Sequence, residues 1–302
     1  MDGNGFVFVQ FPGWQVNGMQ AKRFNQECTS NIIISKNLTK EEIMRELEPL
    51  RNDALVLINP PSVILSELHI FTNTMLYYDR LPTRTGTEFI KKLPVKVPSL
   101  AFRYQMRKRG IEAQVQLPVP IREEKSKLIR TDYRKQHDID DEDSLLWIDD
   151  RFLTPKQQTL LHETVPTLKR NHKRLRVSWV SDTLPSTMSQ VKVERLQKVA
   201  LKKSWIAADL FITFGNLRHS YSALHVNLLE HQIPILTSRG GDHDEWVRHL
   251  YNGIVLKTSC EKEGMLRFIP QFIQNRSFRQ QLKQNTSQLK TAVFKHNVGG
   301  VT

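Results

Sequence analysis

Two cations five residues apart, Arg151 and Lys156, are the first candidates for chemistry in this chain. Arg151 follows a strand-like apolar segment, SLLWID (144–149), and Lys156 lies in the first turn of a predicted helix that begins near Pro155. Free N–H groups at a helix N-terminus favour anions, and an arginine holds phosphate oxygens through parallel hydrogen bonds. The pair therefore suits a pyrophosphate. The alternative is a surface arginine and a first-turn lysine with nothing to bind, the commoner fate of such residues.

A second candidate for a ligand site is the polar loop that follows a later strand-like segment. The strand-like run DLFITF (209–214) is followed by a polar loop, an apolar helix (223–232), a second strand (234–238) and the turn Gly240–Gly241. In open parallel sheets, ligands bind beyond the carboxyl ends of the strands, and two facing sheets form a cleft between them. The loop after DLFITF is therefore expected to line a ligand cleft.

The first strand–helix loop, FPGWQVNG (11–18), contains Gly13, Asn17 and Gly18. It lacks the order G-x-G-x-x-G, which excludes a dinucleotide fingerprint. A plain tight turn explains these glycines at least as well as a ligand does.

The elements that position these residues alternate between strand and helix. Thr39 followed by Glu42 is a capping-box signature at the start of one helix in the first half. Such alternation predicts a parallel sheet. The expected strands of the first half are 6–11, 31–35, 53–61 and 112–118, and the expected helices lie within 19–27, 39–50, 62–78 and 99–110.

The second half repeats the alternation after a charged stretch without a sustained apolar face, at 121–143. We expect this stretch to be a linker between a shortened N-terminal domain (1–120) and a C-terminal domain (144–302). The second half is expected to have strands at 144–149, 175–181, 209–214 and 234–238, helices at 154–171, 193–208 and 223–232, and a mainly helical remainder.

The bulk composition limits the class of protein. The 302 residues carry a net charge of +13, concentrated in basic runs at 103–110, 122–135 and 169–176. Basic surfaces concentrate nucleic acid, phosphorylated polymers, acidic lipids or nucleotide phosphates, although a single run is more often a solvated face. Cys28 and Cys260 have neither disulfide nor zinc spacing. No signal peptide or membrane span is visible, so a cytoplasmic location is expected.

The second half, from Ser144 to about Lys290, resembles the retaining nucleotide-sugar glycosyltransferases of the GT-B architecture, in the large group called family 4. The first half resembles them only by its order of strands. The resemblance implies an α/β fold with two Rossmann-like, doubly wound domains that face each other across a cleft. The matching positions are the pair Arg151 and Lys156, the strand Pro234–Leu236, the pair Gly240–Gly241, the acid Glu245, and Asn252–Gly253.

Several positions depart from the family pattern. The two acidic residues of the family fall on His219 and Asn227, and its Gly-Phe-Gly segment falls on Ser220, Tyr221 and Ser222. The resemblance implies that His219 contacts the sugar and Asn227 the ribose. An amide still donates and accepts hydrogen bonds to a diol. The serines add Cβ atoms where the backbone approaches the phosphates, so catalysis or the usual donor is in question.

The resemblance also assigns the remaining positions. Arg151 and Lys156 would contact the donor diphosphate, Glu245 would orient the glycine pair, and Gly18 would lie near the donor phosphate and the acceptor. His69 would lie near the sugar, and a helix-surface histidine is the alternative. Asp79 is expected to face the cleft for a reason other than the resemblance, because it is a polar residue at the end of an apolar stretch, and a helix C-terminal turn is the alternative.

The sequence therefore predicts a glycosyltransferase that moves a sugar from a nucleotide-sugar donor with retention, without a metal or organic cofactor. The acceptor is unknown: a glycan, a protein or a polyanionic polymer. Contact with the inner face of the membrane or with a partner glycosyltransferase stays open. One alternative is a non-catalytic GT-B-like subunit or chaperone for a glycosyltransferase or glycoprotein, favoured by His219 and Asn227. Another is a sugar transferase that modifies DNA or another polyanion, motivated by the charge of +13.

Overall fold

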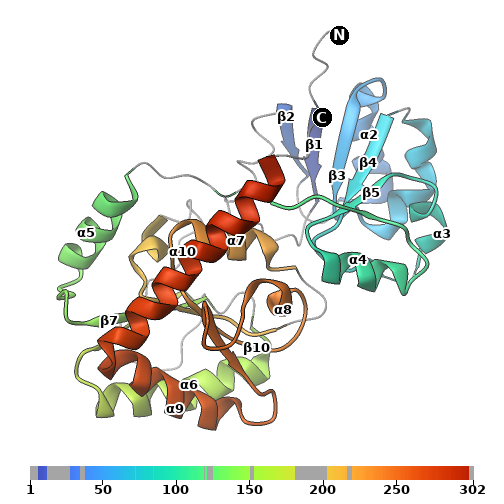
Figure 1. The fold of residues 1–302 in the computed structure, drawn as a ribbon. Coiled ribbons are helices and arrows are strands. Elements are labelled where there is room, and N and C mark those ends of the chain that lie inside the picture. Colours follow the sequence, from blue (N-terminus) through green and yellow to red (C-terminus); the bar gives the residue numbers. More distant parts are fainter. Residues whose placement is uncertain are drawn as a thin grey trace. The chain divides into compact units, whose positions relative to one another are not determined.

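A computed structural model divides the chain into two compact units (Figure 1). The first unit comprises residues Met1–Ile121 and Asn216–Ala223, and the second comprises Arg122–Gly215 and Leu224–Thr302. We describe each unit by itself. The structure describes residues 6–11, 28–34, 38–71, 73–83, 85–118, 120, 125–149, 153–180, 203–215 and 220–298.

The first unit is built on a parallel sheet with the strand order β2-β1-β3-β4-β5-β6. The order of the strands reverses between β1 and β3, where Val7 pairs with Leu55. All five residues of β3 are buried, as expected of a parallel strand that is covered on both faces. The strands are β1 (Phe6–Gln10), β2 (Cys28–Ile33), β3 (Ala54–Ile58), β4 (Asn73–Tyr77), β5 (Val95–Val97) and β6 (Gln114–Val115).

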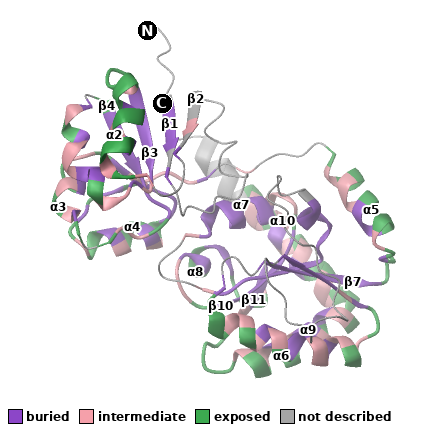
Figure 2. Ribbon diagram, turned by 180° about the vertical axis from the view of Figure 1, so that it is seen from behind, coloured by how far each residue is buried: buried purple, intermediate pink, exposed green. Residues whose placement is uncertain are grey.

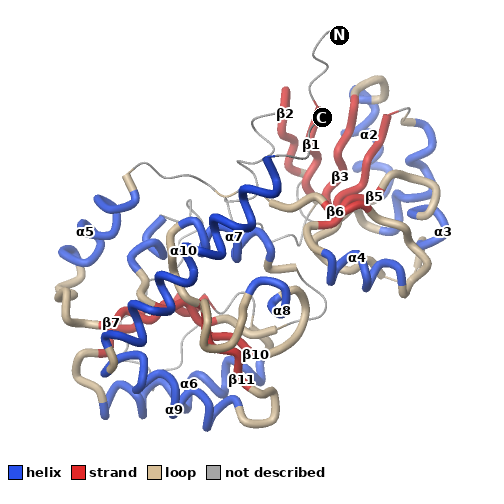
Figure 3. The backbone as a smooth tube through the Cα atoms, in the orientation of Figure 1, coloured by secondary structure: helices blue, strands red, loops and turns tan. Residues whose placement is uncertain are grey.

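Short helices connect these strands (Figure 3). The predicted capping box is confirmed, because the Glu42 N–H donates to Thr39 Oγ1 and the Thr39 N–H donates to Glu42 Oε2. Ser99 caps the helix that ends before Gly110, whose φ of +69° suits glycine. The helices are α2 (Lys40–Leu47), the 3₁₀ helices η1 (Glu48–Leu50) and η2 (Ser62–Ile70), α3 (Thr87–Ile90) and α4 (Leu100–Arg107).

The single helix predicted for 62–78 is wrong. The chain forms η2 up to Ile70 and then the strand β4. In β4, Asn73 is exposed, Thr74 is buried, Met75 is half-buried, and the last two residues are buried. A short apolar run does not distinguish a buried strand from a helix by periodicity alone. Asn73 and Thr74 are residues that favour turns and strands over helix interiors, and they mark the change.

The second unit contains a five-stranded parallel sheet with the order β11-β10-β9-β7-β8. Here the order reverses between β7 and β9. Together the two sheets confirm the predicted α/β class with two doubly wound domains. The strands are β7 (Ser144–Asp149), β8 (Leu175–Val180), β9 (Leu210–Ile212), β10 (Ile235–Ser238) and β11 (Gly253–Leu256).

Helices cover the second sheet, whose strands are buried while much of the helix surface is exposed (Figure 2). In the described part of the chain, no helix is both long and apolar enough to span a bilayer. The helices are α5 (Ser126–Gln136), α6 (Pro155–Asn171), the 3₁₀ helix η5 (Lys203–Ala207), α7 (Ser222–Glu230), α8 (His243–Trp246), α9 (Glu261–Gln274) and α10 (Arg276–Val298).

One expectation for the second half changes. The stretch 121–143, expected to be a linker, contains α5, whose Tyr133 and Arg134 are buried in the second unit. The C-terminal remainder is mainly helical, as predicted, with the short strand β11 at Gly253–Leu256. The helix predicted for 193–208 lies largely outside the described residues, and its described end forms η5.

Candidate functional site

The carboxyl edge of the second sheet is the candidate site. Its strands are parallel, so β7, β9 and β10 end at this edge, at Asp149, Ile212 and Ser238. The strand order reverses between β7 and β9, and in open α/β sheets such a switch point is where ligands bind. The loops that follow these three strands are therefore the ones that could hold a ligand.

Glycine backbone lines the loops after β9 and β10. A Cβ at Gly215 would lie 2.5 Å from the Arg239 carbonyl oxygen and 2.8 Å from the Gly240 nitrogen, so no other residue fits without a backbone shift. The Gly215 N–H donates to Ser238 Oγ at 3.3 Å. Gly240 and Gly241 have φ values of +132° and +64°, a region that glycine adopts without strain. These half-buried glycines bring two stretches of backbone together without intervening side chains, which is the construction that lets N–H groups approach an anion.

A buried histidine pair connects the segment after the Gly240–Gly241 turn to helix α7. His225 Nε2 on α7 lies 2.8 Å from His243 Nδ1 at the start of α8, and both side chains are buried. One of these nitrogens must carry the proton and the other must accept it. The ring of Trp246 stacks on His225 with 6.1 Å between centroids. The pair therefore fixes the segment after the glycine turn against α7.

Burial keeps both histidines neutral. It lowers the pKa of His225 well below 6.5, and the neighbouring His243 lowers it further. Burial also lowers the pKa of His243, against opposing effects from Asp242 and from a hydrogen bond to the Phe214 backbone. Phe214 lies two residues after the end of β9, and His243 lies in the segment after β10, so this hydrogen bond connects the loops that follow two neighbouring strands. These residues were missed from the sequence, where nothing marks two histidines 18 positions apart as neighbours.

The predicted cation pair is only half described. Arg151 lies outside the described residues, and Lys156 is exposed in the first turn of α6, directly after β7. The helix start is capped internally: Thr154 Oγ1 accepts from the Gln157 N–H, and Pro155 has no N–H. The N-terminal donors that the sequence suggested for an anion are thus partly used. The exposed ammonium group of Lys156 is the charged group that this helix start offers, and its role in phosphate binding stays a prediction.

The other predicted site residues differ in burial and in whether the structure describes them. His219 and Gly18 lie outside the described residues. Asn227 is 1% exposed on the inside of α7, so in this structure its amide belongs to the packing and is not open to a ribose. Glu245 is exposed on α8, close in sequence to the glycine turn.

Ser220, Tyr221 and Ser222, which stand where the family has Gly-Phe-Gly, belong to the first unit by their contacts. Tyr221 and Ser222 are buried, and the Ser222 N–H donates to Ser220 Oγ at 3.2 Å. The Ser220 N–H donates to the Asp79 carbonyl oxygen at 2.6 Å. Ser222 also begins α7. Ser220 therefore takes part in local structure, and donor binding by this segment stays a prediction.

Asp79 lies at the carboxyl edge of the first sheet. Its Oδ1 accepts from Asn59 Nδ2 at 2.6 Å, and its N–H donates to Asn59 Oδ1 at 3.2 Å. Asn59 follows β3 with a φ of +49°, a left-handed conformation that asparagine tolerates. The pair joins the ends of β3 and β4. His69 is exposed on η2, with its Nδ1 2.7 Å from the Ser66 carbonyl oxygen.

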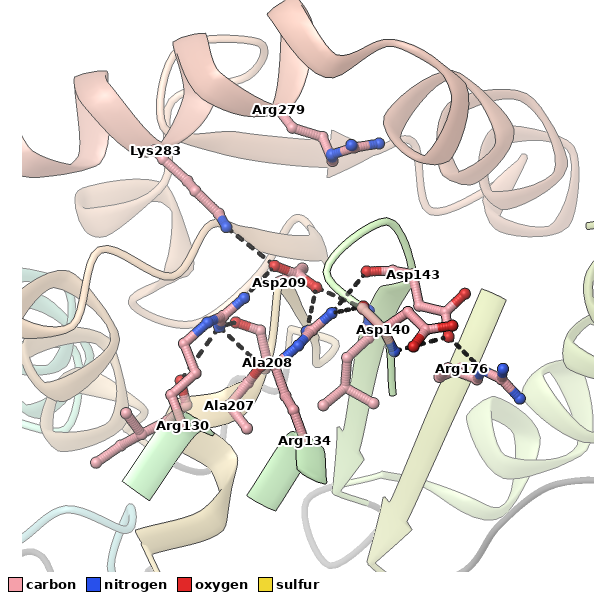
Figure 4. Close-up of polar contacts among 12 residues, drawn as sticks. Arg130, Arg134, Asp140, Asp143, Arg176, Ala207, Ala208, Asp209, Arg279 and Lys283 are labelled. Carbon is pink, nitrogen blue, oxygen red and sulfur yellow. Dashed lines mark hydrogen bonds and ion pairs between the residues drawn. The ribbon is translucent and has the colours of Figure 1, made fainter. Parts of the chain in front are cut away.

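The opposite, amino edge of the second sheet holds a dense charge cluster (Figure 4). Asp209, just before β9, receives Arg130 at 2.6 Å and Lys283 at 2.9 Å on Oδ1, and Arg134 at 3.1 Å on Oδ2. The Leu145 N–H also donates to Oδ2 at 2.9 Å.

This cluster is structural. Burial alone would raise the pKa of Asp209, but Lys283 and Arg130 outweigh it and the pKa falls below its usual range. Arg130 also donates to the carbonyl oxygens of Ala207 and Ala208, at 2.7 and 2.9 Å. The basic run 122–135, which suggested an external anion, thus directs two of its arginines at an internal carboxylate. Among the described residues, each oxygen of this carboxylate already has two partners.

Within the described ranges, no three histidine, cysteine, aspartate or glutamate residues cluster as metal ligands would. The absence of a metal from the reaction stays a prediction.

Comparisons with known proteins identify the fold. No family model and no curated protein matches the sequence. Among solved structures, HepE from Anabaena in complex with UDP-glucose superposes with a TM-score of 0.71 at 12% identity, over 95% of this chain and 94% of that one. WaaG, a glycosyltransferase of lipopolysaccharide biosynthesis, gives 0.66 at 11% over 95% of both chains. A glycosyltransferase from Rickettsia africae gives 0.63 at 10%, over 99% and 100%. The predicted GT-B fold is confirmed.

Proposed function

We propose that the chain is a glycosyltransferase that binds a nucleotide sugar at the carboxyl edge of its second sheet. The observation that carries the proposal is the Gly240–Gly241 turn packed against Gly215, next to the switch point of the sheet. Support comes from HepE, which shares the fold and was crystallised with UDP-glucose. A uridine nucleotide is therefore the first donor to test.

The proposed chemistry is electrostatic. When the bond between sugar and diphosphate breaks, negative charge grows on the departing phosphate oxygens. Lys156, exposed directly after β7, and Arg151, five residues earlier, would neutralise that charge. Donors placed in advance where charge develops often provide the largest part of a rate enhancement. Backbone N–H groups of the glycine turn would bind the same oxygens.

We further propose retention of configuration without a metal. If the acceptor attacks from the face that the diphosphate leaves, the leaving phosphate oxygen itself can take the acceptor's proton. No carboxylate base is then required, in agreement with the histidine and asparagine at positions 219 and 227. His219 would contact the sugar. In this scheme the neutral pair His225 and His243 holds the glycine turn and takes no part in proton transfer.

The test is nucleotide binding by calorimetry, with UDP, UDP-glucose, GDP and ADP as probes. Lys156→Ala and Arg151→Ala should each weaken binding of the preferred nucleotide about five- to tenfold, because each removes one charge from a phosphate. The matched controls are Lys173→Ala and Arg174→Ala, exposed cations that precede β8 at the amino edge. Equal effects of both pairs, or no nucleotide binding at all, would refute the proposed site.

A second candidate is a non-catalytic subunit with the same fold. The burial of Asn227 favours it, because the position that would hold the ribose is closed in this structure. Release of free sugar from labelled UDP-glucose separates the two functions. Turnover that disappears in the Arg151→Ala variant supports the enzyme, whereas a chain that neither binds nor hydrolyses any donor supports the subunit.

A further inference from the structure

Helix α4 of the first unit presents an exposed apolar pair. Leu100 is 61% exposed and Tyr104 is 58% exposed, the two highest values among the large hydrophobic residues that the structure describes. They are four positions apart, so they lie on the same face of the helix, one turn from each other. The opposite face, with Phe102 and Met106, is buried in the core of the first unit. The helix is therefore anchored in the core through its buried face.

Cations surround this pair. Arg103, Arg107 and Lys108 are exposed on and just after α4, and Lys108 Nζ lies 4.5 Å from the centre of the Tyr104 ring. Lys91 reaches the end of the helix from α3, since a Cβ at Gly110 would lie 3.1 Å from its Nζ.

Among the residues that the structure describes, acidic groups near α4 do not neutralise the cations. Glu112 lies 4.0 Å from Arg107, and both side chains are mostly in solvent, at 80% and 76% exposed. Exposed pairs of this kind contribute little. Glu88 is exposed on α3. A net positive charge therefore accompanies the apolar pair.

We propose that this face of α4, defined by Leu100, Tyr104, Arg103, Arg107 and Lys108, binds the surface of an anionic lipid bilayer. Apolar side chains framed by basic ones are the composition of helices that lie in a membrane interface. Leu100 would enter the acyl boundary, and tyrosine favours headgroup depth because one end is apolar and the other polar. The cations would contact lipid phosphates.

A bilayer fits better than a nucleic acid. A nucleic acid would use the cations and could stack on the tyrosine, but it has no use for an exposed leucine. Lys108 already covers one face of the Tyr104 ring. Two apolar side chains alone hold a protein weakly on a membrane, so the binding is expected to depend on anionic lipid.

The proposal does not depend on the donor site. The helix begins three residues after β5, so its first turn lies toward the carboxyl edge of the first sheet. If the chain is a glycosyltransferase, this surface would bring that edge to lipid-borne acceptors. Vesicle binding needs no nucleotide sugar, so either idea can fail without the other.

The test is co-sedimentation of the full chain with vesicles of phosphatidylcholine and phosphatidylglycerol, compared with vesicles of phosphatidylcholine alone. The double variant L100S/Y104S should bind the anionic vesicles at least about tenfold more weakly, because it removes the inserted groups. Arg103→Ala and Lys108→Ala should each weaken binding about fivefold. The matched control L128S/L266S removes two exposed leucines from the second unit.

All the substituted side chains are exposed, so unchanged melting temperatures are expected and will show that the variants fold. Equal sedimentation of L100S/Y104S and the unchanged chain would overturn the proposal, as would equal binding to both kinds of vesicle. Loss of single-stranded DNA binding in the arginine and lysine variants, with vesicle binding absent, would assign the surface to a nucleic acid instead.

Discussion

The two edges of the second sheet differ in composition: ion pairs occupy the amino edge, whereas glycines and uncharged side chains occupy much of the carboxyl edge. At the amino edge, Asp209 is paired with Arg130, Arg134 and Lys283, and every charge has a nearby partner. At the carboxyl edge, glycine backbone and a neutral histidine pair leave Lys156 as an exposed cation. The richest cluster of charge is thus a structural device. The plainer edge is the one at which we propose that a ligand binds.

The largest expected effect comes from removing the centre of the amino edge. Asp209→Ala leaves three cations, one of them only 7% exposed, without their carboxylate. Breaking a buried ion pair in this way costs about 3–5 kcal/mol of unfolding free energy. Urea unfolding measures the loss, with Asp132→Ala on exposed α5 surface as the control. Nucleotide affinity of the folded protein should not change, and a variant that loses affinity but not stability would reverse our assignment of the two edges.

The Asp209 carboxylate also makes the stability of the folded chain depend on pH in the acid range. The pKa of Asp209 is lower in the folded chain than the ordinary value of 3.8. Its contribution is therefore fully present above about pH 4 and is lost as the pH falls further.

A smaller loss is expected at the carboxyl edge from Gly215→Ala. The new Cβ would meet backbone atoms of Arg239 at 2.5 Å, so the two loops must move apart. Overpacking of this kind costs about 1–3 kcal/mol. Here nucleotide affinity should fall together with stability. The control is Gly264→Ala in α9, where the new Cβ would lie 2.7 Å from Leu256 Cδ2, the end of a side chain, instead of meeting backbone. If the control loses as much, the close approach of the loops is not what matters.

The histidine pair makes the carboxyl edge sensitive to mild acid. Because the folded pKa of His225 lies below 6.5, the unfolded chain takes up a proton that the folded chain refuses. Stability is complete above pH 6.5 and falls by about 1.4 kcal/mol per pH unit for each such histidine below it. His225→Gln keeps a donor but cannot titrate, so its urea profile between about pH 7.5 and 5.5 should be flatter. Parallel profiles would exclude the pair as the cause.

The smallest expected effect is a difference in stability between variants that each lack one cation of the amino edge. Lys283 is 35% exposed, so solvent screens its attraction to Asp209. Lys283→Met should therefore cost only about 1 kcal/mol or less in urea unfolding. Arg134→Met, at a 7% exposed position, should cost clearly more. Equal losses would show that burial does not set the strength of these pairs.

Much of the fold could be predicted because local signals agree with it. The Thr39–Glu42 box, Pro155 at a helix start and the apolar run of β7 each have a local physical cause, and the structure contains all three. The prediction of a single helix at 62–78 failed because a 3₁₀ helix and a strand share one apolar run.

The site was harder to predict because it depends on long-range contacts. The arginines of α5 looked like part of a solvated linker until their partner Asp209, about 80 positions later, was visible. Asn227 lies on a helix whose every side chain from Ser222 to Leu229 is buried, and without an alternating polar face the sequence does not show which side an amide occupies. Glycine pairs were easier, because a positive φ leaves few other choices.

The parallel pairing of both sheets has a consequence for synthesis of the protein. No tight hairpin can join parallel neighbours, so each of the described ladders needs a crossover before its two strands meet. Contacts between residues far apart in sequence form slowly, and strand edges wait unpaired in the meantime. We therefore expect slow refolding from urea, with yields that fall as the protein concentration rises. Production at low temperature with added chaperones should raise the recovered fraction.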